Sequence, residues 1–347
     1  MVDKEFCMSS YLAFRYIEAK DKEFYPNVHH KTCPMIPINE RIPVVSAKAI
    51  DEEITKEFAT LRSKKLGILL SGGMDSAICA SYMTGSDAYT FRFLGGNFDS
   101  EELERAEYYA RYYGLRLHYV DIDWQTVERY VDACMEAKGA PVHSIEPQLL
   151  QAALQAKDDG IEMLIVGESS DLIFGGMDKL ISPEWDYDGF KERYTFLNPA
   201  AALVHPVDMD YLFSRYRRGS HGIDYLRFMD DVFAVESSSS YFNAFGVAEM
   251  PYFDPYARLI MAEPLDLERV RNGEPKYLIR ELMAHKYPEI PVPSKVPMPR
   301  PVDIYFKDWE GPKRPEFRKN LDMGQFTGNQ KWQLYCLERF LNLYEKK

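Results

Sequence analysis

The sequence predicts an α/β protein with a doubly wound parallel sheet and a mostly helical C-terminal half. Short apolar runs alternate with helical segments between about residues 61 and 180. Strands separated by helices of that length pair in parallel through right-handed crossovers, which place helices on both faces of a sheet. Beyond residue 180 the apolar residues recur at helical spacing and aromatic residues are frequent. A chain of 347 residues, 46% of them hydrophobic, is long enough for two domains.

The first 60 residues are expected to form a short N-terminal extension. The segment from Tyr11 to Ile17 alternates in the manner of a strand, and a loop with several prolines follows it. The segment from Asp51 to Lys64 has apolar residues spaced for one face of a helix. The extension is therefore predicted as a strand, a loop and a helix.

Residues 61–180 are expected to form the α/β core. The predicted strands cover residues 66–70, 88–93, 115–120 and 163–167, and the predicted helices cover residues 77–83, 101–113, 124–137 and 147–157. Ligands of such sheets bind beyond the carboxyl ends of the strands. The loops after the first and fourth strands are therefore candidate binding segments.

Residues 181–347 are expected to complete the structure mainly as helices. Helical spacing is found at residues 211–213, 225–229, 278–285 and 331–344. Six prolines between Pro288 and Pro301 exclude a helix and a central strand there. They predict an extended proline-rich loop at about residues 288–315.

The overall composition argues against two classes of partner. A net charge of -12 disfavours a broad nucleic-acid surface, because phosphate contacts need clustered Lys and Arg. No apolar run is long enough for a membrane span, and the N-terminus lacks the pattern of a signal peptide. The five scattered cysteines are expected to be free thiols. The sequence thus predicts a cytoplasmic protein that binds neither nucleic acid nor a membrane.

The segment Ser71-Gly72-Gly73-Met74-Asp75-Ser76 is the most informative motif, since it joins the first buried strand to a helix. Its glycines let the backbone approach an anion, and its serines and the N–H groups at the helix start can donate to phosphate oxygens. The carboxylate of Asp75 would be repelled by phosphates unless Mg²⁺ bridges them. A plain strand-to-helix turn is the alternative, but the complete motif favours a nucleotide site.

A second motif, Gly167-Glu168-Ser169-Ser170-Asp171, follows the fourth strand and emerges at the same edge of the predicted sheet. Taken alone, its two acids fit residues favoured by the dipole at a helix start. Beside a phosphate loop they fit a metal site and a general base. Asp171 can share Mg²⁺ with Asp75, and Glu168 can take a proton from a nucleophile.

These motifs carry a resemblance to a known family. The loop at Ser71 resembles the pyrophosphate loop of the N-type ATP pyrophosphatases. The segment from Gly167 to Asp171, followed by Phe174-Gly175-Gly176, resembles the second motif of the synthetase domain of asparagine synthetases. The resemblance extends over roughly residues 50–305 and includes the segments 245–254 and 273–280.

The resemblance implies an adenine nucleotide alpha hydrolase-like fold and an ATP-dependent, AMP-forming amide ligase. In such enzymes ATP adenylates a small carboxylate with loss of pyrophosphate, and ammonia or an amine then attacks the acyl adenylate. It implies that Glu168 deprotonates the amine and that two lysines, Lys276 and Lys295, are catalytic. It further implies ATP contacts at Leu70, Ser71, Gly72, Gly73, Asp75, Ser76, Phe93 and Gly167, and Mg²⁺ ligands at Asp75 and Asp171. Without the resemblance, Lys295 is an ordinary loop lysine and Lys276 pairs along a helix.

The sequence also departs from the family pattern. Val2 stands where glutamine-hydrolysing relatives carry their nucleophilic cysteine, and some 60 residues are too few for a glutaminase domain. Nitrogen is therefore expected from free ammonia, an amine or a separate glutaminase. Leu172 replaces an acid of the family motif, and Val296-Pro297-Met298 replaces the usual residues after Lys295.

Two other readings of the sequence stay open. One is an RNA-modifying enzyme with the same phosphate loop, although the net charge disfavours it. The other is a protein that binds ATP but has lost the chemistry. The sequence leaves the carboxylate, the amine and the oligomeric state undetermined.

Overall fold

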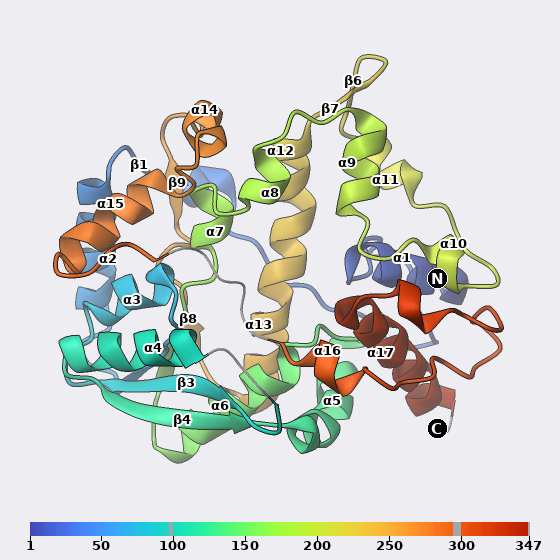
Figure 1. The fold of residues 1–347 in the computed structure, drawn as a ribbon, viewed down its shortest axis with the longest axis horizontal. Coiled ribbons are helices and arrows are strands. Elements are labelled where there is room, and N and C mark those ends of the chain that lie inside the picture. Colours follow the sequence, from blue (N-terminus) through green and yellow to red (C-terminus); the bar gives the residue numbers. More distant parts are fainter. Residues whose placement is uncertain (97–99, 294–299, 346–347) are drawn as a thin grey trace.

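The computed structural model describes residues 1–96, 100–293 and 300–345 (Figure 1). Its central feature is a parallel sheet of five strands in the order β4-β3-β2-β5-β8. The predicted parallel sheet is thereby confirmed. The strands are β2 (Leu66–Leu69), β3 (Asp87–Phe93), β4 (Arg116–Ile122), β5 (Met163–Ile165) and β8 (Tyr252–Phe253).

Helices cover both faces of this sheet (Figure 1). On one face lie α3 (Met74–Ala80) and α4 (Ser100–Tyr112), and on the other lie α5 (Trp124–Lys138) and α6 (Glu146–Asp158). Alternate residues of β3 enter different cores, because neighbouring side chains of a strand point to opposite faces. Ala88 packs in the core with α3, and Tyr89 packs in the core with α6.

The N-terminal strand predicted at Tyr11 to Ile17 is wrong. The helix α1 (Lys4–Phe14) covers most of that segment, and Asp3 caps it by accepting the N–H of Phe6 at 3.1 Å. Every residue of α1 from Phe6 onward is buried, so the helix has no polar face that would give its sequence a helical period. The predicted helix further along is α2, which begins earlier than expected (Ala47–Thr60).

The C-terminal half is mostly helical, as predicted. A π-helical turn, Met229–Phe233, leads directly into α13 (Ala234–Ala248), which Figure 1 shows running through the centre of the molecule. The other helices are α7 (Ser170–Ile173), α8 (Asp178–Ile181), α9 (Tyr187–Tyr194), α10 (Pro199–Ala202), α11 (Asp210–Ser214), α12 (Tyr225–Phe228), α14 (Leu267–Arg271), α15 (Tyr277–Lys286), α16 (Val302–Tyr305) and α17 (Gly328–Glu345).

Short strand pairs lie outside the main sheet. β1 (Ile42–Val44) pairs in parallel with β9 (Leu259–Met261), and β6 (Arg217–Arg218) pairs antiparallel with β7 (Gly222–Ile223). All five cysteines are free thiols, as predicted. Within the described ranges, no helix combines the length and the apolar character needed to cross a membrane.

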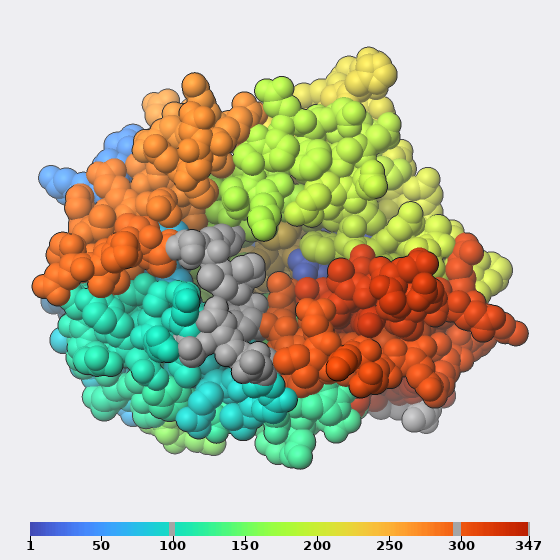
Figure 2. Space-filling model, in the orientation of Figure 1, coloured from blue at the N-terminus to red at the C-terminus, as the bar shows by residue number. Residues whose placement is uncertain are grey.

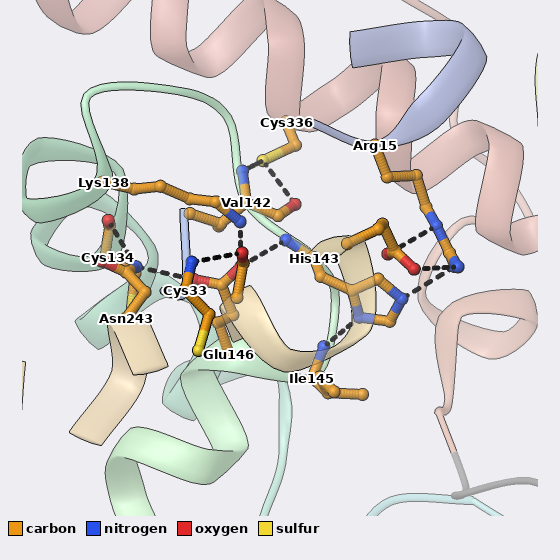
Figure 3. Close-up of polar contacts among 12 residues, drawn as sticks. Arg15, Cys33, Cys134, Lys138, Val142, His143, Ile145, Glu146, Asn243 and Cys336 are labelled. Carbon is orange, nitrogen blue, oxygen red and sulfur yellow. Dashed lines mark hydrogen bonds and ion pairs between the residues drawn. The ribbon is translucent and has the colours of Figure 1, made fainter. Parts of the chain in front are cut away.

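A buried ion pair joins the end of α5 to the start of α6 (Figure 3). The Lys138 Nζ atom lies 2.7 Å from Glu146 Oε1, and neither side chain is more than 3% exposed. The Glu146 carboxylate also accepts the backbone N–H of His143 at 2.9 Å and the amide of Asn243 at 2.6 Å. Burial raises the pKa of Glu146, while Lys138 and these hydrogen bonds act against that effect. The carboxylate is therefore held by contacts from three segments of the chain.

Replacing Lys138 with Met is expected to destabilise the protein by about 3–5 kcal/mol, because it leaves a buried carboxylate without its counter-charge. The matched control is Lys157→Met, whose exposed pair with Glu249 is worth at most about 1 kcal/mol. Urea denaturation of both variants measures the difference. Equal losses of stability in the two variants would contradict the prediction that the buried pair contributes more to stability than the exposed pair.

Candidate functional site

The loop between β2 and α3 is held in shape by its own serines. The Oγ atoms of Ser71 and Ser76 lie 3.0 Å apart, and Ser71 Oγ also accepts the N–H of Gly73 at 3.1 Å. Gly73 is the N-cap residue of α3, and no side chain in the described part of the chain caps that helix. Phosphate oxygens are natural acceptors for the N–H groups of an uncapped first turn. The loop thus has the form expected of a phosphate site.

The glycines of the two motifs have different surroundings. A Cβ atom on Gly72 would lie 2.5 Å from the carbonyl oxygen of Glu102 in α4. A Cβ atom on Gly167 would lie 3.1 Å from the backbone of Asp75. These two glycines therefore allow α4 and the end of β5 to pack onto the loop. Among the described residues, a Cβ atom on Gly73 would meet only the hydroxyl of Ser71, so Gly73 best fits the open approach to an anion that the sequence suggested.

Lys276 joins the two carboxylates that were predicted to hold Mg²⁺. Its Nζ atom forms an ion pair with Asp75, in the first turn of α3, and lies 2.9 Å from Asp171 Oδ1, in α7. The Lys276 side chain is 2% exposed. Burial alone lowers the pKa of Lys276, but the two carboxylates outweigh burial, and the net shift is upward. The ammonium group therefore stays charged between them.

The backbone around this cluster is adapted to it. Lys276 has a φ of 57°, in the left-handed region that is costly for a residue with a side chain. A Cβ atom on Gly176 would lie 2.0 Å from Asp171 Oδ1 and 2.7 Å from Lys276 Cδ. The chain therefore needs a glycine beside the ion pair.

The donor set fits Mg²⁺ only in part. Nowhere in the described residues do three or more His, Cys, Asp or Glu side chains form a cluster that could hold a metal ion. Two carboxylates are nevertheless a typical protein contribution to a Mg²⁺ site that phosphates and water complete. Asp75 and Asp171 are brought together as such a pair requires.

Glu168 lies at the same edge of the sheet and faces α13. Its carboxylate accepts hydrogen bonds from the hydroxyls of Ser237 and, at 3.4 Å, Ser238. Burial raises the pKa of Glu168 to about 8, the Ser237 hydrogen bond lowers it, and neighbouring carboxylates including Asp254 raise it. A carboxyl group with a pKa near 8 gains and loses its proton close to neutral pH, which suits acid–base work.

Sequence reasoning missed three residues of this site. Asp254 follows β8 and accepts the N–H groups of Ser169 at 2.7 Å and Tyr256 at 3.0 Å. Burial raises the pKa of Asp254 to about 6. Ser237 and Ser238 were also missed, although the run of four serines at residues 237–240 was a visible signal. Recognition of β8 would have placed Asp254 at the strand ends.

Two predicted ATP contacts, Leu70 and Phe93, lie where strands of the sheet end. Leu70 is buried beside the loop, and its N–H donates to the carbonyl of Tyr89 at 2.8 Å. Phe93 is the last residue of β3. Both lie at carboxyl ends of neighbouring strands, and their predicted contact with ATP stays a prediction. Lys295 lies outside the described residues.

Known proteins resemble part of this chain in sequence. A model of the asparagine synthase family matches residues 58–232. The glutamine-hydrolysing asparagine synthetase of Asparagus officinalis is 30% identical over 167 residues, which cover 44% of this chain and 27% of that protein. That of Sandersonia aurantiaca is 29% identical over 174 residues, which cover 46% of this chain and 32% of that protein. The chain thus spans about a third or less of the length of these relatives.

The solved structures that match this chain are more distant in sequence. The NMN synthetase from Francisella tularensis is 12% identical, with a TM-score of 0.29, and the match covers 74% of this chain and 99% of that one. The NAD⁺ synthetase from Burkholderia pseudomallei is 11% identical, with a TM-score of 0.27, and the match covers 72% of this chain and 90% of that one.

Replacing Gly176 with Ala is expected to displace the Asp171–Lys276 pair and to destabilise the protein by about 1–3 kcal/mol, the usual cost of overpacking. The control is Gly246→Ala, because a Cβ atom there meets none of the described residues within 4 Å and alanine favours the helix in which it lies. Thermal unfolding and ATP binding measure both effects. Equal behaviour of the two variants would contradict the steric role of Gly176.

The raised pKa of Glu168 predicts a pH dependence of stability. Between pH 4.5, its ordinary pKa, and about pH 8, the folded protein keeps a proton that the unfolded chain has lost. Glu168 therefore makes the free energy of unfolding fall as pH rises through that range. Urea denaturation between pH 5 and pH 8 should give a flatter profile for Glu168→Gln than for the parent. Parallel profiles would show that Glu168 ionises normally.

Proposed function

The chain belongs to the asparagine synthase family, and we propose that it is an ATP-dependent, AMP-forming ligase that joins a small carboxylate to ammonia or an amine. The observation that carries the proposal is the meeting of Asp75, Lys276 and Asp171 beside the phosphate loop, with Glu168 at the same sheet edge. This chemistry needs hydrogen-bond donors that bind phosphate oxygens, oxygen ligands for a cation, and a titratable base.

In the proposed first step, a carboxylate oxygen of the acid substrate attacks the α-phosphorus of ATP, and pyrophosphate leaves. The loop from Ser71 to Ser76 would bind the departing phosphates through N–H and hydroxyl groups. Asp75 and Asp171 would hold Mg²⁺, which when bound supplies positive charge that offsets the charge of pyrophosphate. The buried ammonium of Lys276 adds a fixed positive charge at the same place.

In the proposed second step, the nitrogen nucleophile attacks the acyl carbon of the adenylate and AMP leaves. Glu168 takes the proton that the nitrogen loses, so it must be ionised when the amine arrives. A pKa of about 8 makes it a stronger base than an ordinary carboxylate and leaves part of it ionised at neutral pH. The hydroxyls of Ser237 and Ser238 fix the direction of its oxygens.

The nitrogen source and the second catalytic lysine belong to the same proposal. Free ammonia, an amine substrate or a separate glutaminase partner each supply a suitable nucleophile. Lys295, on the proline-rich loop, would neutralise charge in both transition states, as the family resemblance implies.

Replacing Glu168 with Gln separates the two steps. We expect carboxylate-dependent exchange of pyrophosphate into ATP to continue, because adenylation does not need the base. Amide formation should fall by roughly 10²- to 10⁴-fold. The exposed control, Glu249→Gln, should leave both rates unchanged.

Two results would count against this assignment. Full amide formation by Glu168→Gln would remove Glu168 as the base. Binding of ATP without pyrophosphate release, across a broad panel of carboxylates and amines, would indicate that the fold has kept the nucleotide and lost the chemistry.

A further inference from the structure

Two arginines from distant parts of the chain meet at one histidine. Arg15, at the end of α1, places a guanidinium nitrogen 2.8 Å from His143 Nε2, and Arg300 places one 3.2 Å from the same atom. Figure 3 shows the guanidinium of Arg15 directed toward the ring of His143. Arg15 also lies over the ring of Phe196, 3.6 Å from its centre. Like charges held this close are costly unless a negative group offsets them.

The charges in this cluster do not balance. Glu236, in α13, pairs with Arg15 at 2.9 Å and 3.0 Å and so neutralises it. Burial and both arginines hold the pKa of His143 well below its usual range, so the imidazole is neutral. Across the described ranges, no carboxylate forms an ion pair with Arg300. Burial, with repulsion from Arg15, lowers the pKa of Arg300 to about 10, which still leaves it charged at neutral pH.

Two hydrogen-bond donors without a partner among the described residues belong to side chains that line one pocket with Arg300. A small pocket of about 10 Å³, the size of one water, is lined by Arg300, Gln148 and Tyr305. The side-chain nitrogen of Gln148 and the hydroxyl of Tyr305 are buried, and neither has a hydrogen-bond partner among the residues that the structure describes. A water molecule would satisfy these two groups, but it would not neutralise the guanidinium. An anionic oxygen would do both.

A larger pocket adjoins the small one. It measures about 100 Å³ and is lined by Arg15, His143 and the polar residues Thr327, Asn329 and Gln330, among others. Ser144 and Trp332 line both pockets. Figure 2 shows this face of the molecule hollowed between the yellow-green and the red segments, with blue atoms of the N-terminal segment visible inside.

We propose that Arg300, Gln148 and Tyr305 form an anion-binding site that takes a carboxylate or phosphate group of a small molecule. One anionic oxygen occupies the small pocket, where it accepts from the amide and the hydroxyl and neutralises Arg300. The rest of the molecule lies in the larger pocket beside Arg15, where side-chain amides and hydroxyls offer hydrogen bonds to uncharged polar groups. This site is separate from the phosphate loop and does not depend on the proposed reaction.

Binding of inorganic phosphate, acetate and succinate to the full chain tests the site directly. Isothermal titration is done with the phosphate loop blocked by a non-hydrolysable ATP analogue, so that only the second site responds. We expect saturable binding of at least one anion. Arg300→Met should weaken that binding on the order of tenfold or more, since it removes a charged hydrogen-bond donor. Tyr305→Phe, which removes one oxygen atom, should weaken it less.

The matched control is Arg271→Met. Arg271 is a partly exposed arginine that pairs with Glu184, and its replacement should leave anion binding unchanged. Absence of saturable binding by the parent would overturn the proposal, as would equal binding by the parent and by both Arg300→Met and Tyr305→Phe. Because the titration needs no turnover, its result tests the anion site independently of the ligase activity.

A second measurement identifies the source of the anionic group. Pyrophosphate release is compared for matched monocarboxylic and dicarboxylic acids. A preference for the diacid that is lost in Arg300→Met would assign the group to the acid substrate. Anion binding without such a preference would assign the site to a free anion. Each result supports an anion site, and loss of binding in the parent remains the outcome that rejects it.

Discussion

The ion pairs between Lys276 and the carboxylates of Asp75 and Asp171 are the interaction on which the candidate site depends. Two carboxylates brought this close without a cation would repel each other, and the loop after β2 and the turn of α7 would separate. The lysine also ties α15 to the sheet edge from more than 100 residues away in sequence. Its burial and its left-handed backbone show that the surrounding chain is built to hold that ammonium group in place.

The order of the strands explains why so many polar groups meet here. β2, β5 and β8 are neighbours and run in parallel, so the segments that follow them emerge side by side. The candidate phosphate loop follows β2, Glu168 and Asp171 follow β5, and Asp254 follows β8. The sheet thus collects three acidic segments at one edge, and α13 supplies the hydroxyls that orient Glu168.

Features encoded within one strand, loop and helix were predictable from the sequence. Apolar runs predicted the strand before Ser71 and the strand before Glu168. The helices between these strands predicted that they pair in parallel. Features that depend on distant partners were not predictable. β8 has two residues and exists through its pairing with β5, so no local pattern marks it. The segment at Tyr11 was misread because a helix buried on all sides shows no helical period. The ion pairs of Lys276 required the tertiary structure.

The π-helical turn from Met229 to Phe233 fixes the angular setting of α13. An α-helix rotates by about 100° per residue, and a π turn amounts to one extra residue in the winding. Glu236 pairs with Arg15 and the next residue, Ser237, bonds to Glu168, so the two contacts need that setting together. Removing the extra residue of the π turn would rotate the side chains of Glu236 and Ser237 away from their partners. The irregular turn therefore sets the rotation of α13, which holds Ser237 toward Glu168 and Glu236 toward Arg15 at the same time.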